Sequence, residues 1–347
     1  MLWLSPWMRP LARVQVEVLR ELGVNVKLVT TNQHPEADGS RDYELVLDAR
    51  PKVPRTWKPF AGAVAEARRF GPDVVVTELV RDPRWLAFGA LAPRIQVVHD
   101  DLPHDASELR PRWEERVFDT WGSSARATVT FSDYVGNAVR ARRVRGAGGD
   151  VRVVPLTSDV TDARVPAVVG REERRDMVLV GRLNPYKNLE VVFDAWAEHT
   201  RGSHWQGDEL VMIGPGDVRG PLPDHVRWIR GPYTYSDVLP ILARAKASLV
   251  HYRRASQSGV QVLSMQLGVV PIASNCGALP EFQPTGGPVV DRDDVSGLAA
   301  AFDVYADPVV AAEGGQRARA HYEAVYSAKS AAAAWLEVIG DVVGSTS

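Results

Sequence analysis

The sequence has a single cysteine and no long apolar run, and both absences narrow the class of protein. Cys276 is the one thiol among 347 residues, which excludes an intramolecular disulfide and a cysteine-rich metal site. No segment approaches the ~20 apolar residues that span a bilayer. The opening MLWLSPWMRP lacks the basic region of a secretory signal. We therefore expect a cytoplasmic protein that does not associate with membranes.

The chain also lacks a strong charge of either sign. Its formal net charge is −2, so no bulk electrostatic argument favours a nucleic-acid partner, and we expect none. The composition, 45% hydrophobic and 24% charged, is that of an ordinary globular protein. A length of 347 residues suffices for two domains. Homo-oligomerisation is left open by these quantities.

The sequence does contain two series of alternating strands and helices. Between Leu156 and Arg175 the periodicity disappears, and charged and turn residues become frequent. We therefore predict an N-terminal acceptor-binding domain over 1–160, a C-terminal donor-binding domain over 161–320 and a final helical segment over 321–347. The predicted strands of the first series are Leu2–Leu4, Val24–Thr30, Glu44–Leu47, Asp73–Thr77, Arg94–His99, Ala127–Phe131 and Val151–Val154. Those of the second series are Met177–Val180, Glu209–Ile213, Val226–Ile229, Ser248–Val250 and Val269–Ala273.

Helical spacing of apolar residues separates most of these strands. Strands that alternate with helices form parallel sheets with helices on both faces, and ligands bind outside the carboxyl ends of such strands. We therefore predict an α/β fold of two doubly wound, Rossmann-like domains with an interdomain cleft. The predicted helices are Leu11–Leu22, Phe60–Phe70, Arg112–Ser123, Leu189–His199, Ser236–Ala245, Gly259–Leu267, a helix from Val295, and Ala312–Val343.

Two cations directly follow the strand Met177–Val180. In the segment GRLNPYKN, Arg182 offers a planar fork for two phosphate oxygens and Lys187 offers a point charge. Such a pair suits a leaving diphosphate, whose charge develops as the bond to it breaks. The alternative is two solvated surface cations.

A second anion-binding feature is the start of the helix Gly259–Leu267. Gly259 permits close approach of a ligand to the backbone, and with Val260 it offers the free N–H groups of a helix N-terminus. The alternative is a plain loop-to-helix turn. The loop Gly231-Pro232-Tyr233, between a strand and a helix, is suited to binding the edge and face of a nucleobase, or is a simple turn with a half-buried aromatic ring.

Four further residues are candidates on the N-terminal side: His99, Trp7, Arg9 and Asp100. His99 ends a buried strand; a core or loop histidine held by the backbone is the commoner case, and the position at the carboxyl end of a strand raises the odds of a functional role. Trp7 and Arg9 follow the first strand and are candidates for binding an acceptor, although most tryptophans are packing residues. Asp100 and Asp101 point to opposite faces if the strand continues, so joint chelation is not expected and we predict no metal ion.

The chain resembles the retaining, family-4 type of GT-B glycosyltransferases. The resemblance rests on GRLNPYKN at Gly181–Asn188 and VHDDLP at Val98–Pro103, and more loosely on FSDYVGNAVR at Phe131–Arg140 and VVPLTSD at Val153–Asp159. It implies that Arg182 and Lys187 hold the diphosphate of a nucleotide-sugar donor. It also implies that His99 lies near the reaction centre as a catalytic residue, and that the final helix returns to the N-terminal domain.

The chain departs from that family where two glutamates eight positions apart are expected. The frame reads SQSGVQVLS, so Ser256 and Ser264 stand at both positions. In the family the first glutamate holds donor-sugar hydroxyls and the second holds the ribose. The resemblance therefore assigns Ser256, Gln257 and Ser258 to the donor sugar. It assigns Ser264 to the nucleoside, and serine there loses a charge-assisted acceptor.

These replacements have two interpretations. The enzyme uses an unusual donor, or donor binding is weakened or lost; the persistence of Arg182, Lys187 and His99 favours the first. Arg9-Pro10 also stands where many members have a glycine pair, which indicates a specialised acceptor. On the acceptor side we place Trp7, Arg9 and Asp100.

The resulting hypothesis is a retaining, hexosyltransferase-like enzyme. It transfers a sugar from a nucleotide diphosphate sugar to a small molecule, a natural product or a glycan, without a metal ion or cofactor. Two alternatives remain open from the sequence. One is a non-catalytic nucleotide-sugar-binding protein on the same fold, and the other is a nucleotide-sugar epimerase.

Overall fold

The chain folds into two compact units. The computed structural model describes residues 1–36, 39–100, 111–143, 149–218 and 220–345. Unit 1 comprises Met1–Asp159 together with Ala328–Ser347, and unit 2 comprises Val160–Ser327. The boundaries predicted from the sequence were 160 and 320.

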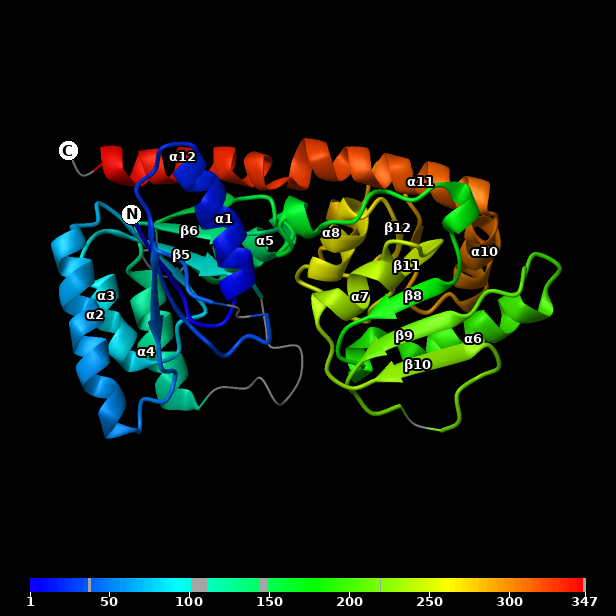
Figure 1. Cartoon of the computed structure of the whole chain (residues 1–347), viewed down its shortest axis with the longest axis horizontal. Helices are drawn as coiled ribbons and strands as arrows, with labels where there is room; N and C mark the ends of the chain where they lie inside the picture. Colours follow the sequence, from blue (N-terminus) through cyan, green and yellow to red (C-terminus); the bar gives the residue numbers. More distant parts are fainter. Residues whose placement is uncertain (37–38, 101–110, 144–148, 219, 346–347) are drawn as a thin grey trace. The chain divides into compact units, whose positions relative to one another are not determined.

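Unit 1 is built on a seven-stranded parallel sheet with the strand order β3-β2-β1-β4-β5-β6-β7 (Figure 1). The order reverses next to β1, as in doubly wound folds, so the carboxyl ends of β1 and β4 flank the switch point where ligands bind in such sheets. The strands are β1 (Leu2–Ser5), β2 (Lys27–Thr31), β3 (Glu44–Leu47), β4 (Val75–Glu78), β5 (Arg94–Val98), β6 (Ala127–Thr130) and β7 (Asp150–Val153).

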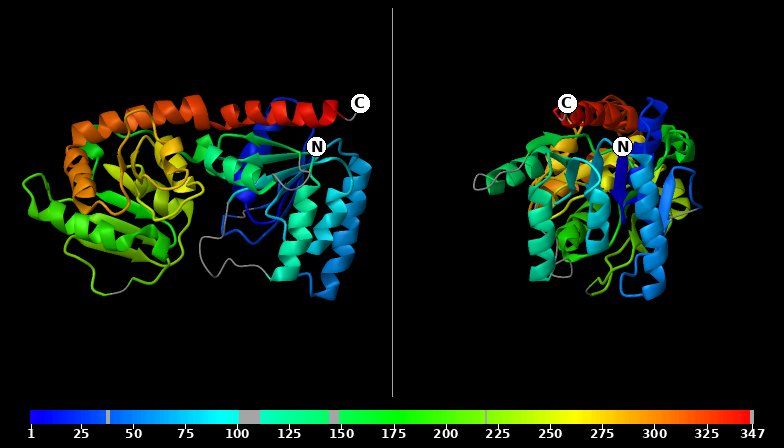
Figure 2. Two further views of the ribbon diagram at one scale, coloured as in Figure 1. Left: turned by 180° about the vertical axis from the view of Figure 1, so that it is seen from behind. Right: turned by 90° about the vertical axis from the view of Figure 1, so that its left-hand side faces the viewer.

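Helices cover both faces of this sheet. Three of them share one apolar cluster with Leu2 and Leu4, so they lie on one face; they form the layer drawn from light blue to blue-green in Figures 1 and 2. They are α2 (Trp57–Phe70), α3 (Leu86–Gly89) and α4 (Arg112–Ser123). The remaining helices of unit 1 are α1 (Arg9–Glu21), α5 (Asp133–Arg143) and α12 (Ala328–Gly344).

The other face of β1 is covered by α12, through a contact between two tryptophans. Because side chains alternate along a strand, Trp3 points away from Leu2 and Leu4. Its ring meets that of Trp335 from α12 edge-on, with centroids 4.8 Å apart, and both side chains are fully buried. The indole N–H of Trp335 donates to the Gln15 side chain of α1. The last helix of the chain is therefore part of the core of unit 1.

Unit 2 is built on a second parallel sheet, with the order β10-β9-β8-β11-β12-β13. The central strands are buried throughout, which explains why they appear in the sequence as continuous apolar runs. The strands are β8 (Met177–Val180), β9 (Leu210–Gly214), β10 (Val226–Arg230), β11 (Ala247–Val250), β12 (Val270–Ser274) and β13 (Val289–Val290).

The two faces of this sheet carry different helices. Met177 and Leu179 of β8 pack against α6 (Leu189–Arg201) and α10 (Val295–Ala306). Val178 and Val180 point the other way and pack against α7 (Tyr235–Leu242) and α8 (Gly259–Gln266). The remaining helices are the short α9 (Leu279–Phe282) and α11 (Pro308–His321).

The predicted fold class of two doubly wound parallel-sheet domains is confirmed. Glu44–Leu47, Arg112–Ser123 and Met177–Val180 are observed with their predicted bounds. The long final helix predicted at Ala312–Val343 is interrupted, because a π-helical turn at Tyr322–Tyr326 leads into an extended Ser327. The interruption lies where the chain passes from unit 2 into unit 1.

Candidate functional site

The loop that follows β8 carries the two predicted phosphate-binding cations. β8 is a central strand, and Gly181 leaves it with φ +116°, a conformation that L side chains rarely adopt. The chain then continues beside β9, where Leu183 donates its N–H to the carbonyl of Pro215 at 2.8 Å. A 3₁₀ turn at Pro185–Lys187 follows, and it returns the lysine side chain to Val180, the last residue of β8. Arg182 and Lys187 therefore both lie at the carboxyl end of the sheet.

Lys187 is a buried cation held by neutral groups. Its side chain is 3% exposed, and Nζ donates to the Val180 carbonyl at 3.1 Å and to the Tyr252 hydroxyl at 2.7 Å. Within the part of the chain that the structure describes, no carboxylate forms a hydrogen bond or ion pair with this ammonium. Burial, with a smaller contribution from the neighbouring charge of Arg182 and against an opposing effect of Tyr186, lowers the pKa of Lys187 to about 8. An ammonium has three N–H donors, so one remains for a ligand.

Arg182 is exposed at the surface of the same loop. Its positive charge acts to lower the pKa of Lys187, as expected for two cations in one short loop. Two like charges raise each other's energy unless an anion lies between or beside them. The structure therefore brings together the two residues that the sequence selected, and their mutual repulsion favours an anionic ligand.

Three residues that the sequence analysis missed complete this region: Tyr252, Arg253 and Arg254. They lie in the loop that follows β11, where the ring of the buried Tyr252 faces the Lys187 ammonium with Nζ 3.9 Å from the ring centroid. Arg253 and Arg254 come next, and the Arg253 N–H donates to the carbonyl of Tyr186 at 2.8 Å. The signal was available, since HYRR follows an apolar strand in the same way that GRLNPYK does. Strand pairing was needed to show that the two loops meet.

The loop after β11 ends at the N-terminus of α8. Ser258 caps this helix, because its side chain accepts the Gln261 N–H at 3.2 Å. Gly259 is exposed and has open space where a side chain would stand, while Val260 is half-buried. The first turn of α8 therefore presents exposed backbone, as the prediction of anion binding at Gly259 and Val260 requires.

The serines at the two glutamate positions are both buried. Ser256 is 1% exposed, and Gln257 is half-buried beside it. Ser264 is fully buried, and its hydroxyl donates back to the Val260 carbonyl at 2.7 Å, one helical turn earlier. The hydroxyl proton of Ser264 is thus used within α8, which leaves only the oxygen lone pairs for a nucleoside.

The predicted nucleoside loop follows β10. Gly231 has φ +122°, Pro232 is exposed, and the half-buried Tyr233 lies next to Gly214 at the end of β9. A side chain at Gly214 would put its Cβ 2.2 Å from the Gly181 carbonyl oxygen, so glycine is required there for the loops to approach. These contacts bring the Tyr233 loop to the same sheet edge as the loop of Arg182 and Lys187.

In unit 1, His99 follows β5 and belongs to a buried polar chain. Its Nε2 lies 2.7 Å from Oε1 of Glu78, the last residue of β4, and the indole N–H of Trp3 donates to Oε2 of Glu78 at 3.4 Å. The His99 ring also meets Phe131 edge-on at 5.0 Å. Glu78 is fully buried and was missed by the sequence analysis, whose predicted strand Asp73–Thr77 ends one residue before it.

The predicted acceptor residues differ in how exposed their side chains are. Trp7 is 46% exposed and Asp100 is half-buried, so both are accessible. Arg9 is 1% exposed, and its guanidinium pairs with both carboxylate oxygens of Glu44, at 2.6 and 3.1 Å. Because this pairing ties α1 to β3, Arg9 is engaged in the core of unit 1, and we leave it out of the proposed site. Asp101 lies outside the described residues.

Among the described residues, no group of three or more His, Cys, Asp or Glu side chains is placed to hold a metal ion. Within the same residues, no single helix is long and apolar enough to cross a bilayer; the bent pair Val295–Ala306 and Pro308–Gly344 meets the criterion by length and composition only.

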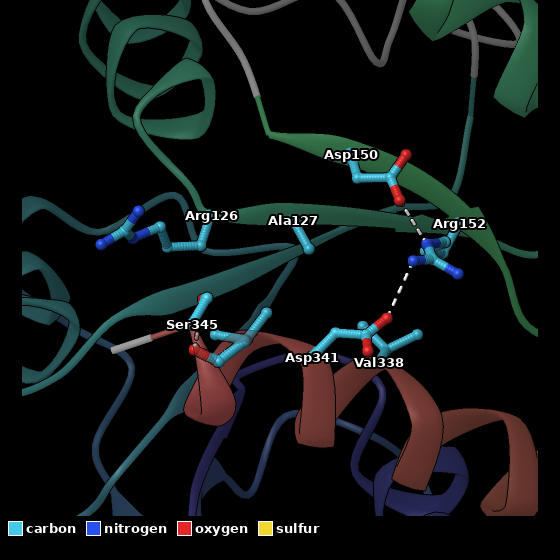
Figure 3. A pocket seen from close by; sticks show the side chains of 8 residues that line it. Arg126, Ala127, Asp150, Arg152, Val338, Asp341 and Ser345 are labelled. Carbon is cyan, nitrogen blue, oxygen red and sulfur yellow. Dashed lines mark hydrogen bonds and ion pairs between the residues drawn. The ribbon is translucent and has the colours of Figure 1, made fainter. Parts of the chain in front are cut away.

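Figure 3 shows a surface hollow of about 170 Å³ in unit 1, between β6, β7 and α12. There Arg152 bridges Asp150 and Asp341, the latter at 2.8 Å. None of the predicted site residues lines this hollow.

The architecture places the chain among proteins of the GT-B glycosyltransferase fold. Sucrose-phosphate synthase from Thermosynechococcus elongatus superposes with a TM-score of 0.70 at 18% identity, over 99% of each chain. Anabaena HepE in complex with UDP-glucose has a TM-score of 0.64 at 15% identity, over 98% of this chain and 99% of HepE. The UDP-forming α,α-trehalose-phosphate synthase from Burkholderia vietnamiensis has a TM-score of 0.66 at 15% identity, over 99% of each chain.

The sequence itself matches a family in unit 2. Residues 174–306 match the model described as glycosyl transferases group 1. This segment contains both cations, the predicted nucleoside loop and the loop Tyr252–Ser258. No curated protein sequence matches the chain at a significant level.

Proposed function

We propose that this protein is a glycosyltransferase that moves a sugar from a nucleoside diphosphate sugar to an acceptor, with retention of configuration and without a metal ion. The observation that carries the proposal is the buried ammonium of Lys187. Burying a cation without a carboxylate is costly, and the cost is recovered when a dianionic diphosphate binds. The family match over residues 174–306 supports the same activity.

Different residues of unit 2 bind different parts of the donor. Lys187 and Arg182 bind the diphosphate and stabilise the negative charge that develops on it as the glycosidic bond breaks. The free N–H groups at the start of α8 add donors without adding charge. The loop at Gly231–Tyr233 binds the nucleoside, and the segment Ser256–Ser258 binds the sugar.

In unit 1, we assign His99 to the reaction centre, as the resemblance implies. The Glu78 carboxylate accepts a hydrogen bond from Nε2 of His99 and thereby fixes which ring nitrogen carries the proton. Trp7 and Asp100 are assigned to the acceptor. The acceptor class we propose is a small molecule or natural product, with a sugar or sugar phosphate as the first candidate, since two proteins of similar fold are named as synthases of sugar phosphates.

Turnover is the direct test. Release of nucleoside diphosphate is measured with a panel of donors, starting from UDP-glucose because a protein of similar fold was solved with it. We expect release that depends on both an acceptor and Lys187, that persists in EDTA, and that yields a product with the donor's anomeric configuration. Binding of donors without release in any donor–acceptor pair would contradict the enzyme assignment and favour the non-catalytic alternative. Solvent deuterium in recovered donor would instead favour an epimerase.

A further inference from the structure

The Lys187 ammonium depends on one side-chain acceptor. Its two hydrogen-bond acceptors are a backbone carbonyl, which no substitution removes, and the hydroxyl of Tyr252 at 2.7 Å. The Tyr252 ring also lies under the same nitrogen at 3.9 Å, within the range of a cation–π contact. One tyrosine thus contacts the ammonium with both its polar end and its face.

Tyr252 is itself held rigidly. Its backbone N–H donates to the Ser274 hydroxyl at 3.1 Å, and that hydroxyl donates to the Tyr252 carbonyl at 2.7 Å. Its ring meets Tyr186 edge-on, with centroids 5.7 Å apart, and the side chain is 3% exposed. Burial raises the pKa of Tyr252, so the phenol stays neutral at working pH and its oxygen remains a dipolar acceptor without a competing negative charge.

The same hydroxyl reaches the helix N-terminus. The side chain of Ser258 acts on the Tyr252 phenol and lowers its pKa against the larger effect of burial, and Ser258 caps α8 by accepting the Gln261 N–H. A continuous chain of contacts therefore runs from Lys187 through Tyr252 to the first turn of α8. These are the two anion-binding features of the proposed donor site, and they come from different strands.

We propose that Tyr252 is a positioning residue of the donor site, which holds the Lys187 ammonium at a fixed place relative to the N-terminus of α8 so that both bind one diphosphate. This inference rests on the proposed function. Tyr252 contacts the lysine and not the ligand, so it acts through Lys187. A cation that is already in place stabilises a developing negative charge without having to move during the reaction. By fixing the Lys187 ammonium, Tyr252 would provide this advantage.

The test uses Tyr252→Phe, which keeps the ring and removes the hydroxyl. Calorimetry with UDP as the probe is expected to show binding weakened roughly tenfold, the lower end for a hydrogen bond to a charged group. The pH above which UDP affinity falls is expected to move downward, because an ammonium without its acceptor loses its proton more readily. Tyr305→Phe is the matched control: Tyr305 is also buried, but it lies in α10 and packs in the core cluster of α6 and β8. It should leave both quantities unchanged.

A double-mutant cycle separates positioning from a purely structural role. If Tyr252 acts through the lysine, Tyr252→Phe should change UDP affinity less than twofold in a Lys187→Met background. The same tenfold loss in both backgrounds would overturn the inference, as would a lowered Tm with unchanged UDP affinity and pH profile. A wild-type protein that binds none of UDP, GDP, ADP and dTDP would instead overturn the proposed function, and the inference with it. Weaker binding in Lys187→Met but not in Tyr252→Phe would overturn the inference alone.

Discussion

Replacing Lys187 by methionine should weaken ligand binding while leaving the folded protein at least as stable. Methionine has a similar length and no charge, so the change removes the ammonium and keeps most of the packing. A hydrogen bond from a charged donor contributes about 1.5–3 kcal/mol. At 1.4 kcal/mol per tenfold in Kd, the variant should bind UDP roughly 10- to 150-fold more weakly.

The same substitution should not lower the free energy of unfolding. The pKa of Lys187 is about 8 in the folded protein against an ordinary value of 10.5, because burial disfavours the charged form. A fall of that size corresponds to ~3 kcal/mol of unfavourable free energy for the buried ammonium at neutral pH. We therefore expect Lys187→Met to be at least as stable as the wild-type protein at pH 7, although it loses the hydrogen bonds to Val180 and Tyr252.

The pH dependence follows from the same pKa. Between about pH 8 and 10.5 the unfolded chain binds the lysine proton and the folded chain does not, so this residue makes the wild-type protein more stable as pH rises through that window. The methionine variant lacks this contribution. The stability of the wild-type protein relative to the variant should therefore increase with pH across the window and be level below it.

Two measurements check this reasoning. Calorimetric titration with UDP at pH 7 gives the affinities, and urea unfolding at several pH values gives the difference in unfolding free energy. A variant that binds UDP as tightly as the wild-type protein would refute the role of Lys187 in donor binding. A difference in stability that does not change between pH 8 and 10.5 would refute the burial of a charged ammonium.

Three further predictions concern residues around the site and in the core. Arg182→Ala should weaken UDP binding by about 1.5–3 kcal/mol without loss of Tm, because the side chain is exposed; unchanged calorimetric affinity would contradict its assignment. Glu78→Gln should reduce turnover while leaving UDP affinity unchanged, because Glu78 orients His99 in unit 1 and the donor residues lie in unit 2; normal kcat would exclude that role. Trp335→Ala should lower the unfolding free energy by about 3–5 kcal/mol in urea, since it leaves a cavity beside Trp3; a loss below 1 kcal/mol would mean that α12 is dispensable for unit 1.

The fold followed from local patterns because its central strands, such as β1, β4, β8 and β11, are fully buried. Apolar runs such as Met177–Val180, separated by helical spacing and glycine, predict parallel α/β units without any knowledge of contacts. Element ends were less predictable, and the break at Ser327 was missed because no glycine or proline marks it and the alanine-rich segment after it has high helix propensity.

The sequence by itself determined that Arg182 and Lys187 stand at the carboxyl end of a strand, because position after an apolar run is a local property. Only the tertiary structure decided what surrounds them: Tyr252 lies 65 positions from Lys187 in the chain, and Glu78 lies 21 positions from His99. Those partners meet because neighbouring parallel strands end at one edge of a sheet, and no spacing in the sequence encodes which strands are neighbours. The same reason applies to Arg9. Its position after the first strand indicated a ligand-binding residue, but β3, which pairs with β2, carries Glu44, and the two side chains form a buried ion pair.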